Sequence, residues 1–395
     1  MADWKELTVG DLCDTISDTY RRRDDKVILV NTSDVLEGQI LNRKCVDNKN
    51  LKGQFKKTFK KGDILYSEIR PANKRNAYVD FEDTERYIAS TKLMVLRPKT
   101  DVIFPRFLFA FLTSSQVLAK LQHLAETRSG TFPQITFSSE LAPLPISVPD
   151  LETQEKIVRL LSSIEEKIQN NNTINNNLEQ QLLAYYRELF ITNAKATWIV
   201  GTIADLGNVV GGSTPSKKKA EYYTDNGIAW ITPKDLSNDH SKFITHGEID
   251  ITELGFANSA AVRMPSGTVL FSSRAPIGYI AIADGEVTTN QGFKSVVPFA
   301  EIGTAFVYCF LKENLTIIEN MASGSTFKEI SGSTMKVVPA IIPDSDTLSL
   351  FKDYADVIFN QQRNKETENK RLSSVRDLLL PRLMSGELDI SDLDL

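Results

Sequence analysis

The sequence is poor in the residues that most metal centres and catalytic sites require. Cysteine and histidine occur only three times each in 395 residues, and none of them has the spacing of a metal-binding motif. The cysteines, Cys13, Cys45 and Cys309, are an odd number and lie far apart, which argues against a disulfide framework and favours a reducing compartment. No Walker A loop and no Gly-x-Ser-x-Gly nucleophile motif occurs. We therefore predict no catalytic residue, no bound cofactor and no metal ion in this chain.

Long apolar runs and an excess of positive charge are missing as well. No apolar run is long enough to span a membrane, and the N-terminus lacks the apolar segment of a signal peptide, so we predict a cytoplasmic protein. The formal net charge is −5, unlike that of most non-specific nucleic-acid-binding proteins. Hydrophobic residues make up 41% of the chain, which is enough for more than one globular core.

The most informative feature that is present is an internal repeat. The segment 4–12 reappears at 198–206, and the segment 144–150 reappears at 338–344, in both cases at an offset of 194 residues. Six such landmarks follow one another in the same order, with offsets between 194 and 205. The chain therefore consists of two copies of one unit of about 195 residues.

Each copy begins with a globular part and ends with a long helix. Short β-branched and aromatic runs alternate with Gly and Pro in the globular part, and residues 104–121 have an apolar, helix-like pattern, which is typical of an α+β domain. The pairs Pro149–Asp150 and Pro343–Asp344 suit helix starts.

Apolar residues in the first long helix follow a heptad seam with spacings of four and three. The seam positions are Ile157, Leu161, Ile164, Ile168, Asn171, Asn175, Leu178, Leu182, Tyr185 and Leu189. The second copy keeps this phase, with Arg376 as an exception, at Phe351, Ala355, Ile358, Gln362, Lys365, Asn369, Leu372, Leu379 and Leu383.

Both seams have a polar centre, and polar seam residues cost stability but fix the register of a helix pair. We therefore predict that the two helices pair with one another as an antiparallel coiled coil. An alternative for the Asn-rich run 169–177 is a flexible linker.

The predicted fold class is α+β, with two similar globular domains separated by two long antiparallel helices and related by an internal pseudo-twofold repeat. The predicted parts are a first domain (1–150), a central helix (151–192), a second domain (193–344), a distal helix (345–388) and an acidic tail (389–395).

Basic residues are concentrated locally despite the negative total. Residues 43–75 contain eleven Lys or Arg and three acidic residues. A basic triplet at 21–23 also falls close to a second one at 217–219 after superposition of the repeats. A charge run is commonly a solvated face, but its recurrence in both copies favours contact with phosphate groups.

Several motifs give the whole chain a resemblance to one family. They are Gly211–Ser216 followed by Tyr223, Gly227, Trp230–Ile231 and Asp235, then Phe59–Leu65 with Ile69–Pro71, Gly324–Ile330, and the tail Leu379–Leu388. Together they resemble the DNA-specificity (S) subunit of type I restriction-modification systems. The first copy departs from the pattern, because Ser17–Tyr20 replaces Gly-Gly-Ser-Thr.

The resemblance implies two target-recognition domains, each of which reads one half of a split, asymmetric site on double-stranded DNA. On this basis the candidate DNA-binding residues are Arg21, Arg22, Arg23, Arg70, Lys74, Arg75, Thr214, Ser216, Lys217, Lys218, Lys219, Lys234, Arg274 and Lys328. The helices would set the spacer, since 33 residues from Ile157 to Leu189 span roughly 50 Å as a helix and one turn of B-DNA is about 34 Å.

The resemblance also implies partners. Two methyltransferase (M) subunits would bind the helices and carry S-adenosylmethionine, and two restriction (R) subunits would join for ATP- and Mg-dependent cleavage. Two alternatives stay open from the residues alone. One is an adaptor or decoy that binds M subunits without selective DNA binding, and the other is a nuclease with a degenerate metal site.

Overall fold

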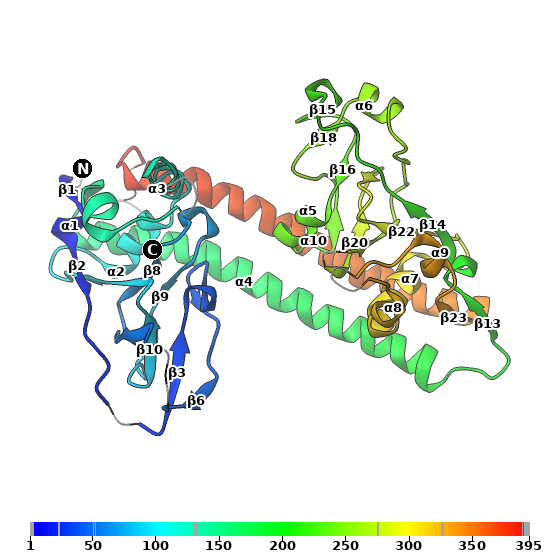
Figure 1. The fold of residues 1–395 in the computed structure, drawn as a ribbon, viewed down its shortest axis with the longest axis horizontal. Coiled ribbons are helices and arrows are strands. Elements are labelled where there is room, and N and C mark those ends of the chain that lie inside the picture. The colour runs from blue at the N-terminus through cyan, green and yellow to red at the C-terminus, as the bar shows by residue number, and fades with distance from the viewer. Residues whose placement is uncertain are drawn as a thin grey trace. The chain divides into compact units, whose positions relative to one another are not determined.

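The structure, a computed structural model, describes residues 4–22, 24–49, 51, 53–128, 133–274, 276–324, 328–388 and 390. These residues divide into two units (Figure 1). Unit 1 comprises residues 1–168 and 371–395, and unit 2 comprises residues 169–370. Each long helix contributes residues to both units. The predicted domain boundaries follow the sequence repeat instead, and they stay predictions.

Unit 1 is built around a four-stranded sheet of order β2-β11-β8-β9. Its strands are β2 (Cys13–Ile16), β11 (Leu93–Pro98), β8 (Ile64–Ser67) and β9 (Asn76–Tyr78). A second sheet of order β6-β3-β10-β7 contains β6 (Cys45–Asp47), β3 (Lys26–Val30), β10 (Tyr87–Ser90) and β7 (Phe55–Lys57). Two strand pairs complete the unit, β1 (Lys5–Thr8) with β12 (Pro145–Val148) and β4 (Val35–Leu36) with β5 (Gln39–Ile40). Its helices are α1 (Val9–Leu12), α2 (Pro105–Leu112) and α3 (Ser115–Arg128).

Unit 2 repeats the central sheet in the order β14-β22-β19-β20-β17. Its strands are β14 (Gly207–Gly211), β22 (Lys294–Pro298), β19 (Val269–Ser273), β20 (Ile277–Ala283) and β17 (Phe243–Ile244). The remaining strands pair as β13 (Ile199–Thr202) with β23 (Pro339–Ile342), β15 (Tyr223–Thr224) with β18 (Asp250–Ile251), and β16 (Trp230–Ile231) with β21 (Thr288–Thr289). The helices are α5 (Pro233–Asn238), α6 (Glu253–Ala257), α7 (Thr304–Glu313), α8 (Leu315–Met321) and α9 (Gly332–Lys336).

Side chains of the central strands alternate between two cores, as the two-residue period of a strand requires. In β8, Ile64 and Tyr66 join a core with residues of the long helices, and Leu65 joins a separate core with the second sheet. In β19, Phe271 faces the helices and Leu270 faces away from them. Each unit therefore has a helix-proximal half and a distal half, with β3, β6 and β10 in the distal half of unit 1 and β15, β18 and α6 in that of unit 2 (Figure 1).

The long helices are α4 (Leu151–Arg187) and α10 (Ser345–Met384), and a further turn, Glu188–Thr192, follows α4. The side chains of Asp150 and Asp344 accept hydrogen bonds from the backbone N–H groups of Thr153 and Thr347, so the predicted helix starts are confirmed. Because α4 runs through the Asn-rich residues 169–177 without a break, the flexible-linker alternative is wrong.

Every predicted seam residue of α4 is buried or half-buried, and so are the seam residues of α10. The polar centre lies in unit 2, where Asn171 Nδ2 donates to Asn369 Oδ1 over 2.9 Å and Gln362 Nε2 donates to the Asn175 carbonyl over 3.1 Å. Residues further along α4 contact residues that come earlier in α10, so the two helices run antiparallel. In unit 1, Arg376 interrupts the apolar seam and pairs with Glu165 at 3.7 Å.

One predicted element needs correction, since residues 104–121 do not form a single helix. The chain breaks between α2 and α3, where the Thr113 hydroxyl donates to the Phe109 carbonyl and the Ser114 hydroxyl accepts from the Val117 N–H. Hydroxyl side chains of this kind compete with the helix for its backbone groups. In the part of the chain that the structure describes, no helix is sufficiently long and apolar to cross a membrane.

Candidate nucleic-acid interface

Three segments of the chain meet in the same way beside the central sheet of each unit. In unit 1, the Glu68 N–H donates to the Lys92 carbonyl over 3.1 Å, and the Ile135 N–H donates to the Glu68 carbonyl over 2.8 Å. In unit 2, the Ser273 N–H donates to the Gly292 carbonyl over 2.7 Å, and the Ile330 N–H donates to the Ser273 carbonyl over 3.1 Å. We call these places the strand-end junctions. They comprise residues 67–70, 90–93 and 133–135 in unit 1, and residues 272–274, 290–294 and 328–330 in unit 2.

The junction of unit 2 is rich in positive charge. Arg274 Nη1 lies 3.5 Å and Lys294 Nζ lies 3.8 Å from the Glu329 carboxylate, while Lys294 Nζ also donates to the Gln291 carbonyl over 3.3 Å. Lys328 is exposed next to Glu329. Because Arg274 and Lys294 share one carboxylate and Lys328 adds a third cation, the junction carries a surplus of positive charge, which suits contact with DNA phosphates.

A glycine-containing loop closes against this junction. The Ser213 N–H donates to the Thr289 carbonyl over 2.9 Å, and the Thr214 hydroxyl donates to Gln291 Oε1. A Cβ atom on Gly212 would lie 2.1 Å from the Asn290 carbonyl oxygen, so only glycine permits this approach. The Gln291 amide is a group of the kind that reads base edges, and the loop fixes its oxygen.

Two aromatic side chains hold the same loop by hydrogen bonds to its backbone carbonyl groups. Trp230 Nε1 donates to the Ser213 carbonyl over 3.0 Å, and the Tyr223 hydroxyl donates to the Pro215 carbonyl over 2.6 Å. Their rings meet edge to face with centroids 5.8 Å apart. The predicted residues Ser216, Lys217, Lys218 and Lys219, all exposed, follow directly after this fastened loop. Lys219 Nζ lies 5.0 Å from the Tyr222 ring centroid.

The junction of unit 1 has different side chains on the same backbone frame. Lys92 Nζ lies 3.4 Å from both Glu68 Oε2 and Gln134 Oε1. Lys57 Nζ donates to the Leu93 carbonyl over 2.8 Å, and burial lowers the pKa of Lys57. Gln134 takes the place that Glu329 has in unit 2. The two junctions therefore offer different hydrogen-bonding groups.

The remaining predicted residues of unit 1 lie around this junction or elsewhere in the unit. Arg70 belongs to it, with its N–H donating to the Pro133 carbonyl and its backbone in the left-handed region at φ 45°. Lys74 pairs with Glu37 at 3.0 Å, and Arg75 donates to the Ser33 carbonyl over 3.1 Å.

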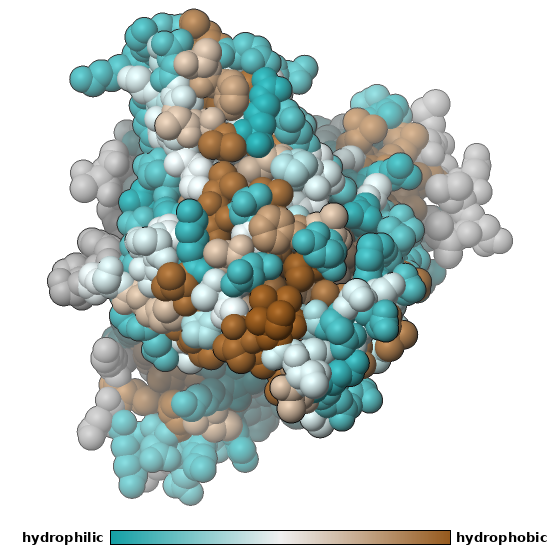
Figure 2. Space-filling view, turned by 90° about the vertical axis from the view of Figure 1, so that its right-hand side faces the viewer, coloured by the Kyte–Doolittle hydropathy of each residue, from teal (hydrophilic) through white to brown (hydrophobic). Residues whose placement is uncertain are grey.

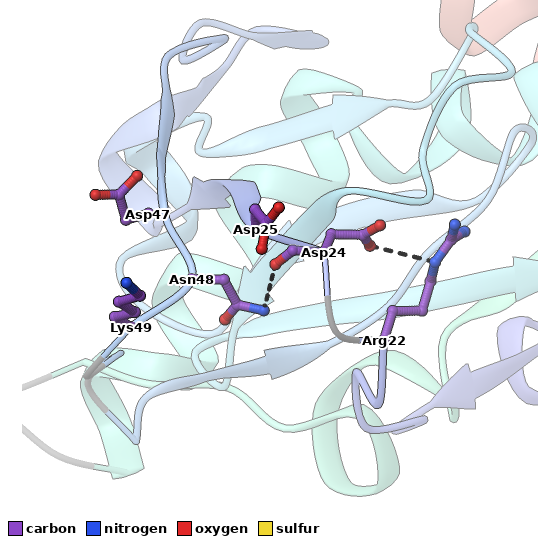
Figure 3. A pocket seen from close by; sticks show the side chains of 6 residues that line it. All are labelled: Arg22, Asp24, Asp25, Asp47, Asn48 and Lys49. Carbon is purple, nitrogen blue, oxygen red and sulfur yellow. Dashed lines mark hydrogen bonds and ion pairs between the residues drawn. The ribbon is translucent and has the colours of Figure 1, made fainter.

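In the first basic triplet, Arg22 lies among acidic side chains. Arg22 pairs with Asp24 at 3.2 Å and with Glu85, and it lines a surface pocket together with Asp24, Asp25, Asp47, Asn48 and Lys49 (Figure 3). Asp24 and Glu85, which both pair with Arg22, compete with a phosphate for its guanidinium. Arg21 is exposed, and Arg23 lies outside the described residues. The DNA-binding role of the triplet stays a prediction.

In unit 2, Lys234 pairs with Glu248 at 2.6 Å, and both side chains are exposed. The preceding residue, Pro233, lies so close to Gly292 that a Cβ on the glycine would be 2.9 Å from Pro233 Cγ. The N-terminus of α5 therefore lies beside the junction. Thr214, Lys234, Arg274 and Lys328, which are far apart in the sequence, are all brought to this part of unit 2.

Sequence reasoning missed several residues of the junctions. They are Lys92 and Gln134 in unit 1, and Asn290, Gln291, Lys294 and Glu329 in unit 2. A turn signal at Asn290–Gly292 between two apolar runs could have identified the central segment of unit 2. Among the described residues, no group of His, Cys, Asp and Glu side chains is arranged to hold a metal ion.

Comparison with known proteins assigns the chain to a family. The model of the type I restriction modification DNA specificity domain matches residues 1–180 and again 195–373. The specificity subunit of the type I restriction enzyme HindI from Haemophilus influenzae is 32% identical, over 98% of this chain and 100% of that protein. The MjaIX specificity subunit from Methanocaldococcus jannaschii is 37% identical over 47% of this chain and 44% of its own length.

A solved structure agrees with the fold. The S subunit of a type I restriction-modification system from M. genitalium superposes with a TM-score of 0.51 and 17% identity, covering 99% of this chain and 97% of that one. The chain therefore belongs to the family of type I restriction-modification DNA specificity subunits. The resemblance and the fold class predicted from the sequence are both confirmed.

Proposed function

We propose that this specificity subunit recognises a two-part DNA site in which each unit reads one part. The observation that supports this most directly is the repetition of the strand-end junction with different side chains. On the same backbone frame, Glu68 and Gln134 of unit 1 correspond to Ser273 and Glu329 of unit 2. The junction of unit 2 also holds Gln291 and Arg274. Two similar frames with different hydrogen-bonding groups suit two different half-sites.

The same proposal assigns the chemistry to partner subunits. Two M subunits bind along α4 and α10, carry S-adenosylmethionine and extrude the target base from the duplex. Two R subunits then use ATP and Mg²⁺ for cleavage, all in the cytoplasm. The overall charge of −5 supports weak DNA binding by this chain alone, with further phosphate contacts supplied by the M subunits. The helix pair sets the spacer between the half-sites.

The test is a pair of matched double variants expressed with the cognate M subunit, followed by sequencing of the methylated host genome. Gln291→Ala with Lys294→Ala changes only unit 2, and Lys92→Ala with Gln134→Ala changes only unit 1. Each variant is expected to relax one half-site and to leave the other half-site unchanged, with roughly 1–3 kcal/mol of lost discrimination for each base contact removed.

Two outcomes contradict the proposal. If either variant changes both half-sites, the units do not read separate parts of the site. If the unaltered chain copurifies with M subunits but retains no DNA selectively, the adaptor alternative is correct instead.

A further inference from the structure

A lysine with a buried ammonium group lies where the globular part of unit 2 meets the helix segments of the same unit. Lys242 directly precedes β17, and its side chain is only 7% exposed. Its ammonium donates to Glu179 Oε2 on α4 and, over 2.6 Å, to Gln362 Oε1 on α10. The Tyr308 hydroxyl on α7 donates to the other Glu179 oxygen over 2.7 Å. One lysine therefore joins the globular part to both helices.

A second carboxylate holds the backbone at the same point. Glu366 of α10 accepts hydrogen bonds from the backbone N–H of Lys242 over 2.8 Å and from that of Phe243 over 3.1 Å. One helical turn earlier on α10, Arg363 lies 4.3 Å from the Phe243 ring centroid and donates to Asp284 over 3.1 Å. The start of β17 is thus fixed through its backbone as well as through its lysine.

The surroundings make these contacts specific. The rings of Tyr308 and Phe359 lie 4.6 and 4.7 Å from Lys242 Nζ, so a displaced ammonium would meet apolar surface. Burial lowers the pKa of Lys242, although Glu179 opposes this change. Burial likewise opposes the charge of Glu179, but Lys242 and Tyr308 outweigh it and hold the pKa of Glu179 below its usual value.

A buried polar contact of this kind favours one position of the globular part along a helix over a position one turn away. Apolar burial is non-directional, and an apolar surface that slides by one turn loses little. A buried ammonium that leaves its carboxylate loses its compensation for desolvation. Polar groups in apolar interfaces are best known for fixing register in this way.

Unit 1 has no such lysine at the corresponding backbone position. There the Gly38 carbonyl accepts from the Tyr78 N–H over 3.0 Å, as the Lys242 carbonyl accepts from the Ile282 N–H over 2.7 Å in unit 2. Gly38 instead lies against the Phe109 ring, since a Cβ atom added to this glycine would be 3.4 Å from the ring. The buried ion pair is therefore a feature of unit 2 and not of the repeat.

We propose that Lys242 is a positioning residue that fixes where the globular part of unit 2 is held along the helix segments of that unit, and so fixes the spacer between the two half-sites. This inference rests on the proposed function. It predicts that loss of the ion pair changes the spacer and leaves the bases of both half-sites unchanged.

The experiment uses the full chain expressed with its M subunit and measures the spacers of all methylated sites in the host genome. In Lys242→Met, methylation at sites with a spacer one base pair longer or shorter is expected to rise about tenfold relative to the main spacer. Lys242→Arg keeps the charge and is expected to retain most of the single spacer. Lys336→Met, which changes an exposed lysine of the same unit, is the matched control and is expected to leave the spacer distribution unchanged.

The spacer distribution separates positioning from a general loss of stability, which would lower methylation at every spacer alike. If Lys242→Met does not fold, Glu179→Gln and Tyr308→Phe weaken the same contacts more gently and are read in the same way. Variants that fold and keep the single spacer overturn the inference and leave the proposed function intact. If the unaltered chain methylates no two-part site with a fixed spacer, the proposed function fails and the inference fails with it.

Discussion

Unit 1 and unit 2 agree in their helix-proximal halves and differ in their distal halves. Four strands of the central sheets have the same order, β2-β11-β8-β9 in unit 1 and β14-β22-β19-β20 in unit 2, where β17 is added at the edge. The distal half of unit 1 contains a four-stranded sheet, whereas that of unit 2 contains two separate strand pairs. The shared half has to pack against an apolar helix surface, which restricts its shape. The distal half has no such partner within its unit and is free to vary.

A second difference lies on the strand pair that precedes each long helix. At the start of β1 unit 1 has Lys5 and Glu6, but at the corresponding positions of β13 unit 2 has Ile199 and Val200, which are 67% and 80% exposed. Ile341 of β23 and the nearby Val337 are exposed as well. Figure 2, which faces the side where β13 and β23 lie, shows hydrophobic surface near its centre. Single exposed apolar residues are ordinary, but a group of them distinguishes unit 2 from unit 1.

The largest expected loss of stability follows from substitutions in the helix-proximal cores. Phe351 of unit 2 corresponds to Ile157 of unit 1, and both are almost fully buried. Phe351 contacts the rings of Tyr186 and Phe190, with centroids 5.8 and 5.2 Å away. Phe351→Ala is expected to lower the free energy of unfolding by about 3–5 kcal/mol, and Ile157→Ala by about 2–5 kcal/mol with a smaller loss than Phe351→Ala.

Urea denaturation followed by tryptophan fluorescence measures this difference, because Trp198 lies 5.9 Å from the Phe190 ring in unit 2 and Trp4 packs against the core that contains Ile157 in unit 1. A larger loss for Ile157→Ala would show that the aromatic cluster does not make unit 2 the more tightly packed of the two.

An intermediate loss of stability is expected for a substitution in the loop around Gly212, whose sequence differs between the repeats. Gly212→Ala places a methyl group against the Asn290 carbonyl, so we expect about 1–3 kcal/mol of destabilisation and a weakened half-site for unit 2. The corresponding residue in unit 1 is Asp18, whose carbonyl accepts from the Thr58 N–H over 2.9 Å. Asp18→Ala keeps that backbone bond and is the matched control.

Thermal unfolding and methylation sequencing of both variants measure the contrast. Normal recognition by Gly212→Ala would contradict the close approach of this loop to residue 290.

The smallest expected effect is a pH-dependent one at the start of α10. Hydrogen bonds from Lys195 first, then from Trp198 and Thr347, hold the pKa of Asp344 well below its ordinary value of 3.8. A carboxyl group with a lowered pKa in the folded state contributes its full stabilisation above the unfolded pKa, and this contribution is lost progressively as the pH falls from that value through the folded pKa. Asp344→Asn is therefore expected to destabilise unit 2 most at pH 7 and somewhat less near pH 3, where part of the contribution has been lost.

Urea midpoints at the two pH values measure this effect. Asp150→Asn is the counterpart in unit 1, and we expect a smaller change because the Asp150 carboxylate bonds to Thr153 without a lysine or tryptophan donor among its contacts in the described residues. Equal losses for Asp344→Asn at both pH values would show that the charge of Asp344 is unimportant.

Much of the architecture follows from local pattern. The offset of 194 residues identifies the two copies, and the spacing of four and three identifies both helices and their buried faces. Local pattern is less reliable where hydroxyl side chains compete for backbone groups, and for that reason residues 104–121 form two helices and not one.

The order of the residues was sufficient to predict the repeat, the helix pair and the family, because periodic spacing and motifs can be recognised along the chain without knowledge of its contacts. The tertiary structure was needed to show which side chains share a site, since hydrogen bonds join residues that are far apart in the sequence, such as Thr214 and Gln291 or Lys242 and Gln362. It also showed that Arg22 is engaged by carboxylates while Arg274 and Lys294 share one. Charge counts along the chain do not reveal such pairings, because the distance between two charges in space sets their interaction energy.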